Sequence, residues 1–283
     1  METAKTIKVV RELVDKARES GKTIGLVPTM GALHTGHISL IDAAVRCCDF
    51  VVVSIFVNPT QFAPSEDFDE YPRDFETDLK KCEQAGVNVV FTPSANEMYP
   101  RENLSWVNME KITENLCGLS RPTFFRGVAT VCTKLFNIVR PDVAFFGQKD
   151  AQQAIVIRRM VQDLNMPLAI EVCPTVREKD GLALSSRNQY LSEEQRKEAL
   201  LINKALKKCE AMVQTGERNC KVLVAAMREI LSRGEHIEID YIKIVDTETV
   251  EDIEQIARKA LVAIAAKVGK TRLIDNIIID LTE

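Results

Sequence analysis

The chain has 283 residues, of which 46% are hydrophobic and 28% are charged, so a disordered protein is excluded and about two domains are expected. Its 37 basic and 41 acidic residues give a formal net charge of −4. Because nucleic-acid binding needs a basic surface, nucleic acid is not expected as the main partner.

Residues 1–8 lack the apolar segment of a secretory signal. After them, the first part of the chain alternates helix and strand patterns. Apolar spacing and β-branched runs predict, in order, helix 7–17, strand 23–27 ended by Pro28, a helical stripe at 40–45, strand 50–57, helix 75–82, strand 87–92, helix 127–139, strand 143–146, helix 151–164 and strand 168–173. Such alternation predicts a Rossmann-like, doubly wound parallel sheet with helices on both faces, in a domain of residues 1–175.

The pattern changes after about Val176. A capping box at Ser192 and Gln195 begins a helix that is expected to run to Gln214, and a second helix is expected at 220–232. Strands are predicted at 238–245, 260–268 and 272–280, the last two joined by a two-residue hairpin at Gly269-Lys270. Residues 176–283 are therefore expected to form a smaller α+β domain.

No membrane or metal partner is expected from the apolar and cysteine patterns. The most apolar stretch, 50–57, is too short to span a membrane. The eight cysteines form no Cys-x-x-Cys pair and only three histidines are present, so a zinc site is not expected. We expect the cysteines to be small buried side chains in a reducing, cytoplasmic compartment.

The turn Pro28–His37 carries the sharpest chemical signal. It follows a strand and opens a helix, where unpaired backbone N–H groups favour phosphate. Gly31 and Gly36 allow close approach, and His34 and His37 are spaced to donate hydrogen bonds to phosphate oxygens as charge moves onto a leaving group. The alternative is a glycine-rich turn with two incidental histidines. Neither a P-loop nor a dinucleotide-binding fingerprint is present, because Gly21-Lys22-Thr23 and Gly269-Lys270-Thr271 both lack the first glycine of a P-loop.

Three further segments follow predicted strands or the domain boundary. Asn58-Pro59-Thr60-Gln61-Phe62 offers amides that orient oxygens without adding charge, or is a plain Asn-Pro turn. In 146–153, Lys149 is expected at a phosphate and Asp150 at a ribose hydroxyl, unless Asp150 is only a helix cap. The loop 181–188 is expected to close over a triphosphate with Ser185, Ser186 and Arg187, or is a solvated hinge.

Taken together, these four segments and Tyr71-Pro72-Arg73 resemble the pantoate–β-alanine ligase family. That family belongs to the nucleotidylyl transferases that share a His-x-Gly-His turn with class I aminoacyl-tRNA synthetases. The His-x-Gly-His element specifies only the superfamily, whereas the combination is far more specific and covers essentially the whole chain. The resemblance implies an AMP-forming ligase of pantothenate biosynthesis. Pantoate carboxylate would attack the α-phosphorus of ATP to give pantoyl adenylate and pyrophosphate, and β-alanine would then displace AMP.

The resemblance also implies the roles of individual residues. His37, His34, Lys149 and Arg187 would be catalytic, with His37 as proton donor. Gln61 and Gln153 would bind pantoate, and Gln61 would also bind β-alanine. Mg²⁺ would be held mainly by ATP phosphates, with no protein metal site, and a homodimer is implied. The residues that would bind ATP are Met30, Gly31, Ala32, Leu33, His34, Thr35, Gly36, His37, Gly147, Gln148, Lys149, Asp150, Val176, Leu184, Ser185, Ser186 and Arg187.

Two positions depart from the family pattern. Leu184 stands where the family usually has Met, a volume-conserving change that is expected to be mild. Phe124 stands where the family often has His, which puts any role of that imidazole in doubt. Two other functions stay open: a nucleotidyltransferase for another small acid or phosphate ester, and a nucleotide-binding module without catalysis. The paired glutamines disfavour a phosphate-bearing acceptor, and the set of histidines and cations disfavours a mere binding module.

Overall fold

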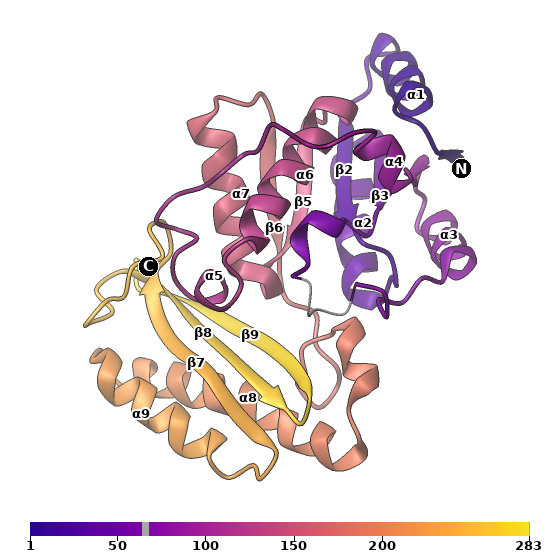
Figure 1. Cartoon of the computed structure of the whole chain (residues 1–283). Helices are drawn as coiled ribbons and strands as arrows, with labels where there is room; N and C mark the ends of the chain where they lie inside the picture. The colour runs from indigo at the N-terminus through magenta and orange to yellow at the C-terminus, as the bar shows by residue number, and fades with distance from the viewer. Residues whose placement is uncertain (64–67, 283) are drawn as a thin grey trace. The chain divides into compact units, whose positions relative to one another are not determined.

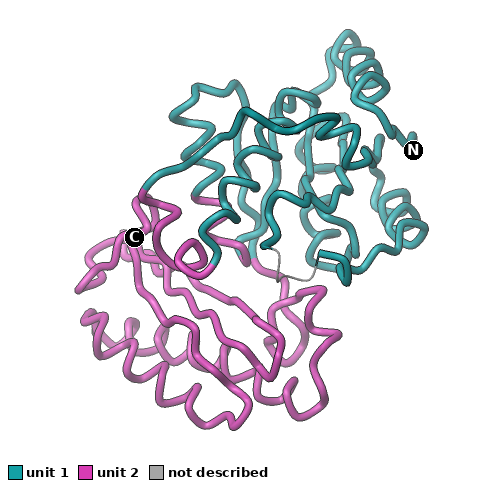
Figure 2. Tube along the Cα trace, in the orientation of Figure 1, with its two compact units in different colours: residues 1–110, 121–148, 156–174 teal, residues 111–120, 149–155, 175–283 magenta. Residues whose placement is uncertain are grey.

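The structure is a computed structural model that describes residues 1–63 and 68–282. Two compact units make up the chain (Figure 2). Unit 1 comprises residues 1–110, 121–148 and 156–174, and unit 2 comprises residues 111–120, 149–155 and 175–283. Two short segments that precede residue 175 therefore pack with the C-terminal part of the chain.

Unit 1 contains a six-stranded sheet in which every strand pair is parallel (Figure 1). The strand order is β1-β4-β3-β2-β5-β6. The bounds are β1 Glu2–Ala4, β2 Ile24–Thr29, β3 Phe50–Ile55, β4 Val89–Phe91, β5 Val143–Gly147 and β6 Ala169–Cys173. The chain moves outward from β2 to β3 and β4, and then returns to β5 on the other side of β2. The strand order thus reverses between β2 and β5, the point where doubly wound sheets bind ligands at their carboxyl ends.

Helices cover both faces of this sheet. On one face α2 (Thr35–Cys47) packs against α3 (Phe75–Gln84), and on the other α1 (Ile7–Glu19) packs against α6 (Phe124–Val139). α6 also contacts α7 (Ala151–Asp163), because Thr133 Oγ1 donates to Met160 Sδ. The central strand β3 is buried from both sides, with Val51, Val52 and Val53 at most 1% exposed. The predicted doubly wound α/β architecture is confirmed.

Some predicted boundaries are wrong, and Pro28 shows why. We expected Pro28 to end the strand, but β2 continues to Thr29. The Thr29 carbonyl accepts from Phe56 N on the β3 side, so by alternation Pro28 faces β5. There the ladder stops at Leu26, so the missing N–H of proline removes no hydrogen bond. Strand β3 ends two residues before the predicted Val57, and α6 begins three residues before Gly127.

Unit 2 has a three-stranded antiparallel sheet in the order β7-β8-β9. The strands are β7 Ile237–Asp246, β8 Lys259–Val268 and β9 Thr271–Asp280, and the helices are α8 Glu193–Gln214 and α9 Cys220–Leu231. The capping box at Ser192 and Gln195 is present, and Val268 pairs with Thr271 across the predicted hairpin, where Gly269 has φ +60°. Side chains from α8, α9 and one face of the sheet form the core of this unit.

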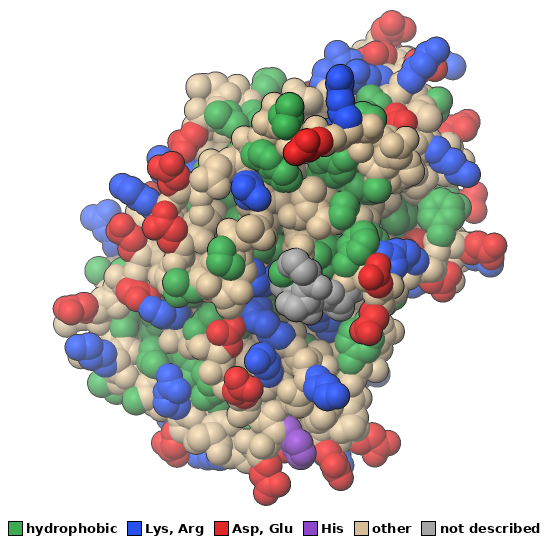
Figure 3. Space-filling model, in the orientation of Figure 1, with side chains coloured by type: hydrophobic (Ala, Val, Ile, Leu, Met, Phe, Trp, Pro, Cys, Tyr) green, Lys and Arg blue, Asp and Glu red, His purple; other side chains and the backbone are tan. Residues whose placement is uncertain are grey.

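Shorter elements complete the chain. They are the helices α4 Ala95–Met98 and α5 Cys117–Ser120 and the 3₁₀ turns η1 Pro59–Gln61, η2 Gln148–Asp150 and η3 Ser186–Tyr190. Among the described residues, no helix is both long and apolar enough to cross a membrane. Acidic and basic side chains are intermingled around the periphery of the face in Figure 3.

All eight cysteines are free, and seven of them are buried. Burial raises the pKa of the Cys82, Cys132 and Cys209 thiols to about 12. The expected role of small buried side chains therefore holds for these seven. Cys47, at the end of α2, is exposed.

Candidate active site

The carboxyl end of β2 passes into a tight turn before α2 begins. Thr29 Oγ1 donates to the Ser54 carbonyl at 2.7 Å and accepts from Gly31 N at 3.2 Å. Gly31 has φ +86°, and a Cβ there would lie 3.0 Å from Ile55 Cγ2 and 3.1 Å from Asp78 Oδ2. The turn therefore needs glycine at this position for both backbone conformation and space.

Asp78 on α3 holds the turn by hydrogen bonds to its backbone. Its side chain is only 2% exposed, and its Oδ2 and Oδ1 accept from Ala32 N at 2.8 Å and Leu33 N at 2.7 Å. Burial raises the pKa of the Asp78 carboxyl, while these two backbone bonds act in the opposite direction. Lys81 Nζ, one turn further along α3, donates to the Leu33 carbonyl at 2.5 Å. The backbone N–H groups of Ala32 and Leu33 are thus bonded to protein.

His34 and His37 form a capping box at the start of α2. His34 Nδ1 accepts from Gly36 N at 3.1 Å, and His37 Nδ1 accepts from His34 N at 3.3 Å. The ring centroids are 4.1 Å apart. Because Nδ1 of each ring accepts a backbone hydrogen bond, a neutral ring must carry its hydrogen on Nε2. The backbone therefore selects, in both rings, the tautomer whose Nε2–H can donate to an anion.

Gln61 sits at the end of η1, after β3, and is 8% exposed. Its Oε1 accepts from Asn58 Nδ2 at 3.2 Å, and its Nε2 donates to Met30 Sδ at 2.9 Å. Asn58 is itself held by the Gly127 carbonyl and by the Tyr99 hydroxyl. The Gln61 amide is thereby oriented beside Met30 of the β2–α2 turn.

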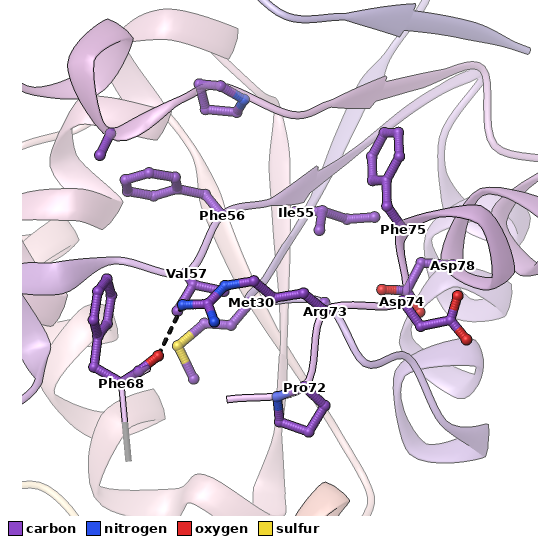
Figure 4. A pocket seen from close by; sticks show the side chains of 13 residues that line it. Met30, Ile55, Phe56, Val57, Phe68, Pro72, Arg73, Asp74, Phe75 and Asp78 are labelled. Carbon is purple, nitrogen blue, oxygen red and sulfur yellow. Dashed lines mark hydrogen bonds between the residues drawn. The ribbon is translucent and has the colours of Figure 1, made fainter. Parts of the chain in front are cut away.

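A pocket of about 350 Å³ lies on the Asp78 side of this turn (Figure 4). It is lined by Met30, Gly31, Ile55, Phe56, Val57, Phe68, Pro72, Arg73, Asp74, Phe75, Asp78, Pro93 and Ala95. Arg73 crosses the pocket and donates to the Phe68 carbonyl at 2.8 Å. His34, His37 and Gln61 are not among the lining residues, but Met30 and Gly31 of the predicted ATP-binding turn are, and Met30 Sδ accepts from Gln61 Nε2.

The block 147–153 is divided between the two units after Gln148. A Cβ at Gly147, the last residue of β5, would meet nothing within 4 Å, so there is open space beside that strand end. Lys149 Nζ lies 3.7 Å from Asp150 Oδ1, and the Lys149 side chain is 20% exposed. Gln153 is half-buried on the first turn of α7. Its neighbour Gln152 has a structural role: it bonds to the backbone of Ile112, Asn115 and Cys117.

The loop predicted to close on phosphates begins as a small hairpin of unit 2. Leu184 N donates to the Val176 carbonyl at 3.0 Å, which places these two predicted ATP-binding residues side by side. Ser185 then caps η3 by accepting from Arg187 N at 3.2 Å. Arg196 of α8 binds Glu178 and Asp180 within the hairpin. The loop is thus anchored at several points and is not a freely solvated hinge.

Comparison with known proteins decides the family. A family model described as pantoate-beta-alanine ligase matches residues 2–278. The chain belongs to the pantoate–β-alanine ligase family. Membership makes it a ligase of pantothenate biosynthesis, as the resemblance of its motifs implied.

Related enzymes match the sequence of this ligase over nearly its full length. Pantothenate synthetase of a Thermoanaerobacter species is 54% identical over 269 residues, 95% of each chain. The Acetivibrio thermocellus enzyme is 51% identical over 280 residues, 99% of this chain and 100% of its own. The structure of pantothenate synthetase from Thermus thermophilus matches with TM-score 0.93 and 42% identity over 98% of this chain and 99% of its own.

One solved relative is a complex with ligands. Pantoate-beta-alanine ligase from Francisella tularensis, complexed with beta-gamma ATP and beta-alanine, has TM-score 0.79 and 34% identity to this ligase. The match covers 98% of this chain and 97% of that chain. Both structural matches support the predicted fold of the ligase.

Phe124, where the family often has His, has a specific partner in this ligase. The Arg121 guanidinium lies 3.8 Å from the centroid of the Phe124 ring, and its Nη2 donates to the Gln61 carbonyl at 3.3 Å. The phenyl ring therefore supports a cation that contacts the backbone of Gln61. An imidazole here would offer the cation a poorer surface when protonated.

Within each unit, the structure brings predicted residues of the ligase together. In unit 1 these are the turn 30–37 and Gln61, and in unit 2 they are Lys149 with Asp150 and Val176 with Leu184. Among residues 1–63 and 68–282, no group of three His, Cys, Asp or Glu side chains is arranged to hold a metal ion. Sequence reasoning missed Asp78, because an acidic residue on a polar helix normally indicates a solvated face.

Proposed function

We propose that the protein condenses pantoate with β-alanine through a pantoyl-adenylate intermediate. A pantoate carboxylate oxygen would bond to the α-phosphorus of ATP as the bond to the bridging oxygen breaks and pyrophosphate leaves. The amine of β-alanine would then attack the acyl carbon, lose a proton and displace AMP. Family membership supports the overall reaction, and the tautomer of the histidine pair supports the first step.

The histidine pair is the observation that carries the proposal. His34 and His37 present Nε2–H because Nδ1 of each ring accepts a backbone hydrogen bond. In the first step, negative charge develops on the bridging and pyrophosphate oxygens. Donors held in place before the reaction stabilise such charge and typically contribute about two to three powers of ten each. We assign ATP to the turn 30–37, with His37 Nε2–H as the hydrogen-bond donor to the leaving pyrophosphate.

Unit 2 would supply the cations. We propose that Lys149 and Arg187 bind phosphates of the same ATP, together with Ser185 and Ser186. Gly147–Asp150 and Val176 would line the adenosine side, and Leu184 would lie on the phosphate side with Ser185, Ser186 and Arg187. Mg²⁺ would accompany ATP, held by phosphate oxygens and water. We also propose that residues 176–283 act as a smaller domain that closes over the active site.

Amides would bind the acid. Gln61 and Gln153 are proposed to bind pantoate, and Gln61 also β-alanine. Two neutral amides suit a carboxylate that must stay nucleophilic, because an Arg salt bridge would weaken its attack. The bond from Asn58 to Gln61 Oε1 supports this role, since it fixes which atom of the amide is the donor toward a ligand.

Pyrophosphate–ATP exchange tests the proposal. The exchange should require pantoate and proceed without β-alanine, because adenylate formation reverses before the amine is needed. No exchange with pantoate would contradict the adenylate step. Exchange with another small acid in preference to pantoate would favour a different nucleotidyltransferase, and ATP binding without turnover of any acceptor would favour a binding module.

We also propose that the protein is a cytoplasmic homodimer. The large apolar side chains of Leu104 and Trp106, 83% and 40% exposed in one segment, support an interaction surface. Sedimentation velocity at micromolar concentration should give twice the mass of the chain. A monomer at that concentration would contradict the dimer.

A further inference from the structure

Strand β9 has a buried polar pair between two apolar runs, Leu273-Ile274 and Ile277–Ile279. Asp275 and Asn276 are only 4% and 5% exposed. Neighbouring residues of a strand point to opposite faces. Asp275 therefore faces the α8/α9 core with Leu273 and Ile279, and Asn276 faces away from it. Buried polar groups are costly unless they are bonded, so each of these two residues needs a specific partner.

Asp275 holds the hairpin that leads to Arg187. Its Oδ2 and Oδ1 accept from Arg177 Nη1 at 2.6 Å and Nη2 at 2.9 Å. Arg177 Nη1 also donates to the Gly181 carbonyl at 3.2 Å, and Arg177 pairs with Ala183 across the hairpin. A two-point ion pair of this kind fixes direction as well as distance. The strand thereby sets where the hairpin ends and where η3, with Arg187, begins.

Asn276 holds the other cation on the opposite face. Its Nδ2 donates to the Lys149 carbonyl at 2.8 Å. Asn276 N also donates to Asp275 Oδ1 at 2.8 Å, so the two neighbouring residues are joined directly. One short piece of β9 therefore contacts both the backbone of Lys149 and the support of Arg187, and all of these residues belong to unit 2.

We propose that Asp275 and Asn276 are positioning residues, which set the spacing between Lys149 and Arg187 so that both cations meet one chain of phosphates. The inference rests on the proposed roles of these two cations. In this proposal the two residues of β9 act through these cations and do not themselves bind substrate. Rigid support matters because a displacement of about 1 Å in a phosphate-binding group can lower the rate about a hundredfold.

A double-mutant cycle tests the Asp275 arm with the whole protein in pyrophosphate–ATP exchange. Asp275→Asn keeps the shape but removes the charge that orients Arg177, and kcat/KM for ATP should fall about 10- to 100-fold. In an Arg187→Ala background, the same change should cost less than about threefold, because the group it positions is gone. A merely structural role would give the full loss in both backgrounds, and that result would overturn the inference.

The Asn276 arm uses the same logic. Asn276→Ala removes the bond to the Lys149 carbonyl and should lower kcat/KM for ATP about tenfold. Introduced into Lys149→Ala, it should have little further effect. An equal loss in both backgrounds would overturn this arm.

The controls separate failure of the inference from failure of the proposed function. Asp280→Asn makes the same change on the same strand at an exposed carboxylate paired with Lys259, and should leave exchange unchanged within about twofold. If Asp275→Asn does not fold by circular dichroism, Arg177→Lys, which keeps the charge but not the two-point bond, replaces it in the cycle. Normal exchange by Arg187→Ala would overturn the phosphate role and the inference together. If Arg187→Ala slows exchange but the effect of Asp275→Asn on kcat/KM is the same in both backgrounds, the inference alone is overturned.

Discussion

His34 and His37 each combine a structural task with the proposed chemical one in the same ring. Each uses Nδ1 to accept a backbone N–H at the start of α2, and this leaves the hydrogen of the neutral ring on Nε2. A substituted side chain that only caps the helix would lose the donor to phosphate, and one that only donates to phosphate would lose the cap. Substitutions can therefore separate the two tasks.

Replacing His37 should slow adenylate formation far more than it destabilises the protein. His37→Ala is expected to lower the rate of pantoate-dependent exchange by about two to four powers of ten, because it removes the Nε2–H group that would stabilise the charge on the leaving pyrophosphate. His37→Gln is the matched control: glutamine at this position of a capping box still accepts the His34 N–H. It should restore the melting temperature but not the rate. A near-wild-type rate in His37→Ala would remove the catalytic role.

Asp78 is expected to matter for both stability and ATP binding. Asp78→Ala leaves the Ala32 and Leu33 N–H groups buried without their acceptor, at a cost of about 2–4 kcal/mol. The turn should relax, so KM for ATP should rise more than KM for β-alanine. Urea unfolding and steady-state kinetics measure the two effects. Equal changes in the two KM values would contradict a specific effect of Asp78 on ATP binding through the turn 30–37.

At the scale of elements, α6 and η1 approach so closely that only glycine fits between them. A Cβ on Gly127 would lie 2.3 Å from the Thr60 carbonyl oxygen, a contact that requires backbone movement. The Thr60 carbonyl belongs to η1, the turn that begins after its N-cap Asn58 and ends at Gln61. The position of α6 therefore determines where the Gln61 amide lies.

Gly127→Ala should destabilise the protein by about 1–3 kcal/mol, although alanine favours helix by about 1 kcal/mol. The displaced turn should also raise KM for pantoate. Gly147→Ala provides the stability control, because its Cβ would meet nothing within 4 Å. Thermal unfolding of the two variants measures the contrast, and equal stability would contradict the packing argument.

The longer elements could be predicted from the sequence because their apolar spacing reports burial directly. β1 could not, since only one of its three residues is buried. The end of β2 was misjudged because the consequence of Pro28 depends on where its neighbour β5 stops pairing, which is a property of the sheet. In the site, His34, His37 and Gln61 follow strands and are visible as local motifs. Asp78 and Asp275 act on segments distant in sequence, and no local pattern reveals such contacts.

For the whole molecule, several carboxylates link stability to pH. Hydrogen bonds lower the pKa of Asp49, through Thr23, and of Asp74, through Thr77. The Arg196 bond lowers the pKa of Asp180, and bonds from Thr282 and Lys259 lower that of Asp280 to about 2. A carboxyl with a lowered folded-state pKa stabilises the protein above its unfolded-state pKa, and this contribution is lost as the pH falls through the folded-state value.

The melting temperature should therefore fall as the pH drops from about 4 towards 2. For Asp280 the window runs from 3.8 in the unfolded chain to about 2 in the folded protein. Asp280→Asn should melt lower than the unaltered protein at neutral pH, and the two curves should converge near pH 2. Calorimetry across this range measures the gap. A gap that stays constant with pH would show that ionisation of Asp280 is not its source.

The lone accessible thiol of the chain stands at the far end of the helix that His34 and His37 begin. A maleimide dye would react at Cys47 first, since the remaining sulfur atoms are shielded until the protein unfolds. The natural chain thus offers a single attachment point for a fluorophore without mutagenesis. Because Cys47 and the turn proposed to bind ATP lie at opposite ends of α2, the anisotropy of the dye would report whether ATP lowers the mobility of this helix.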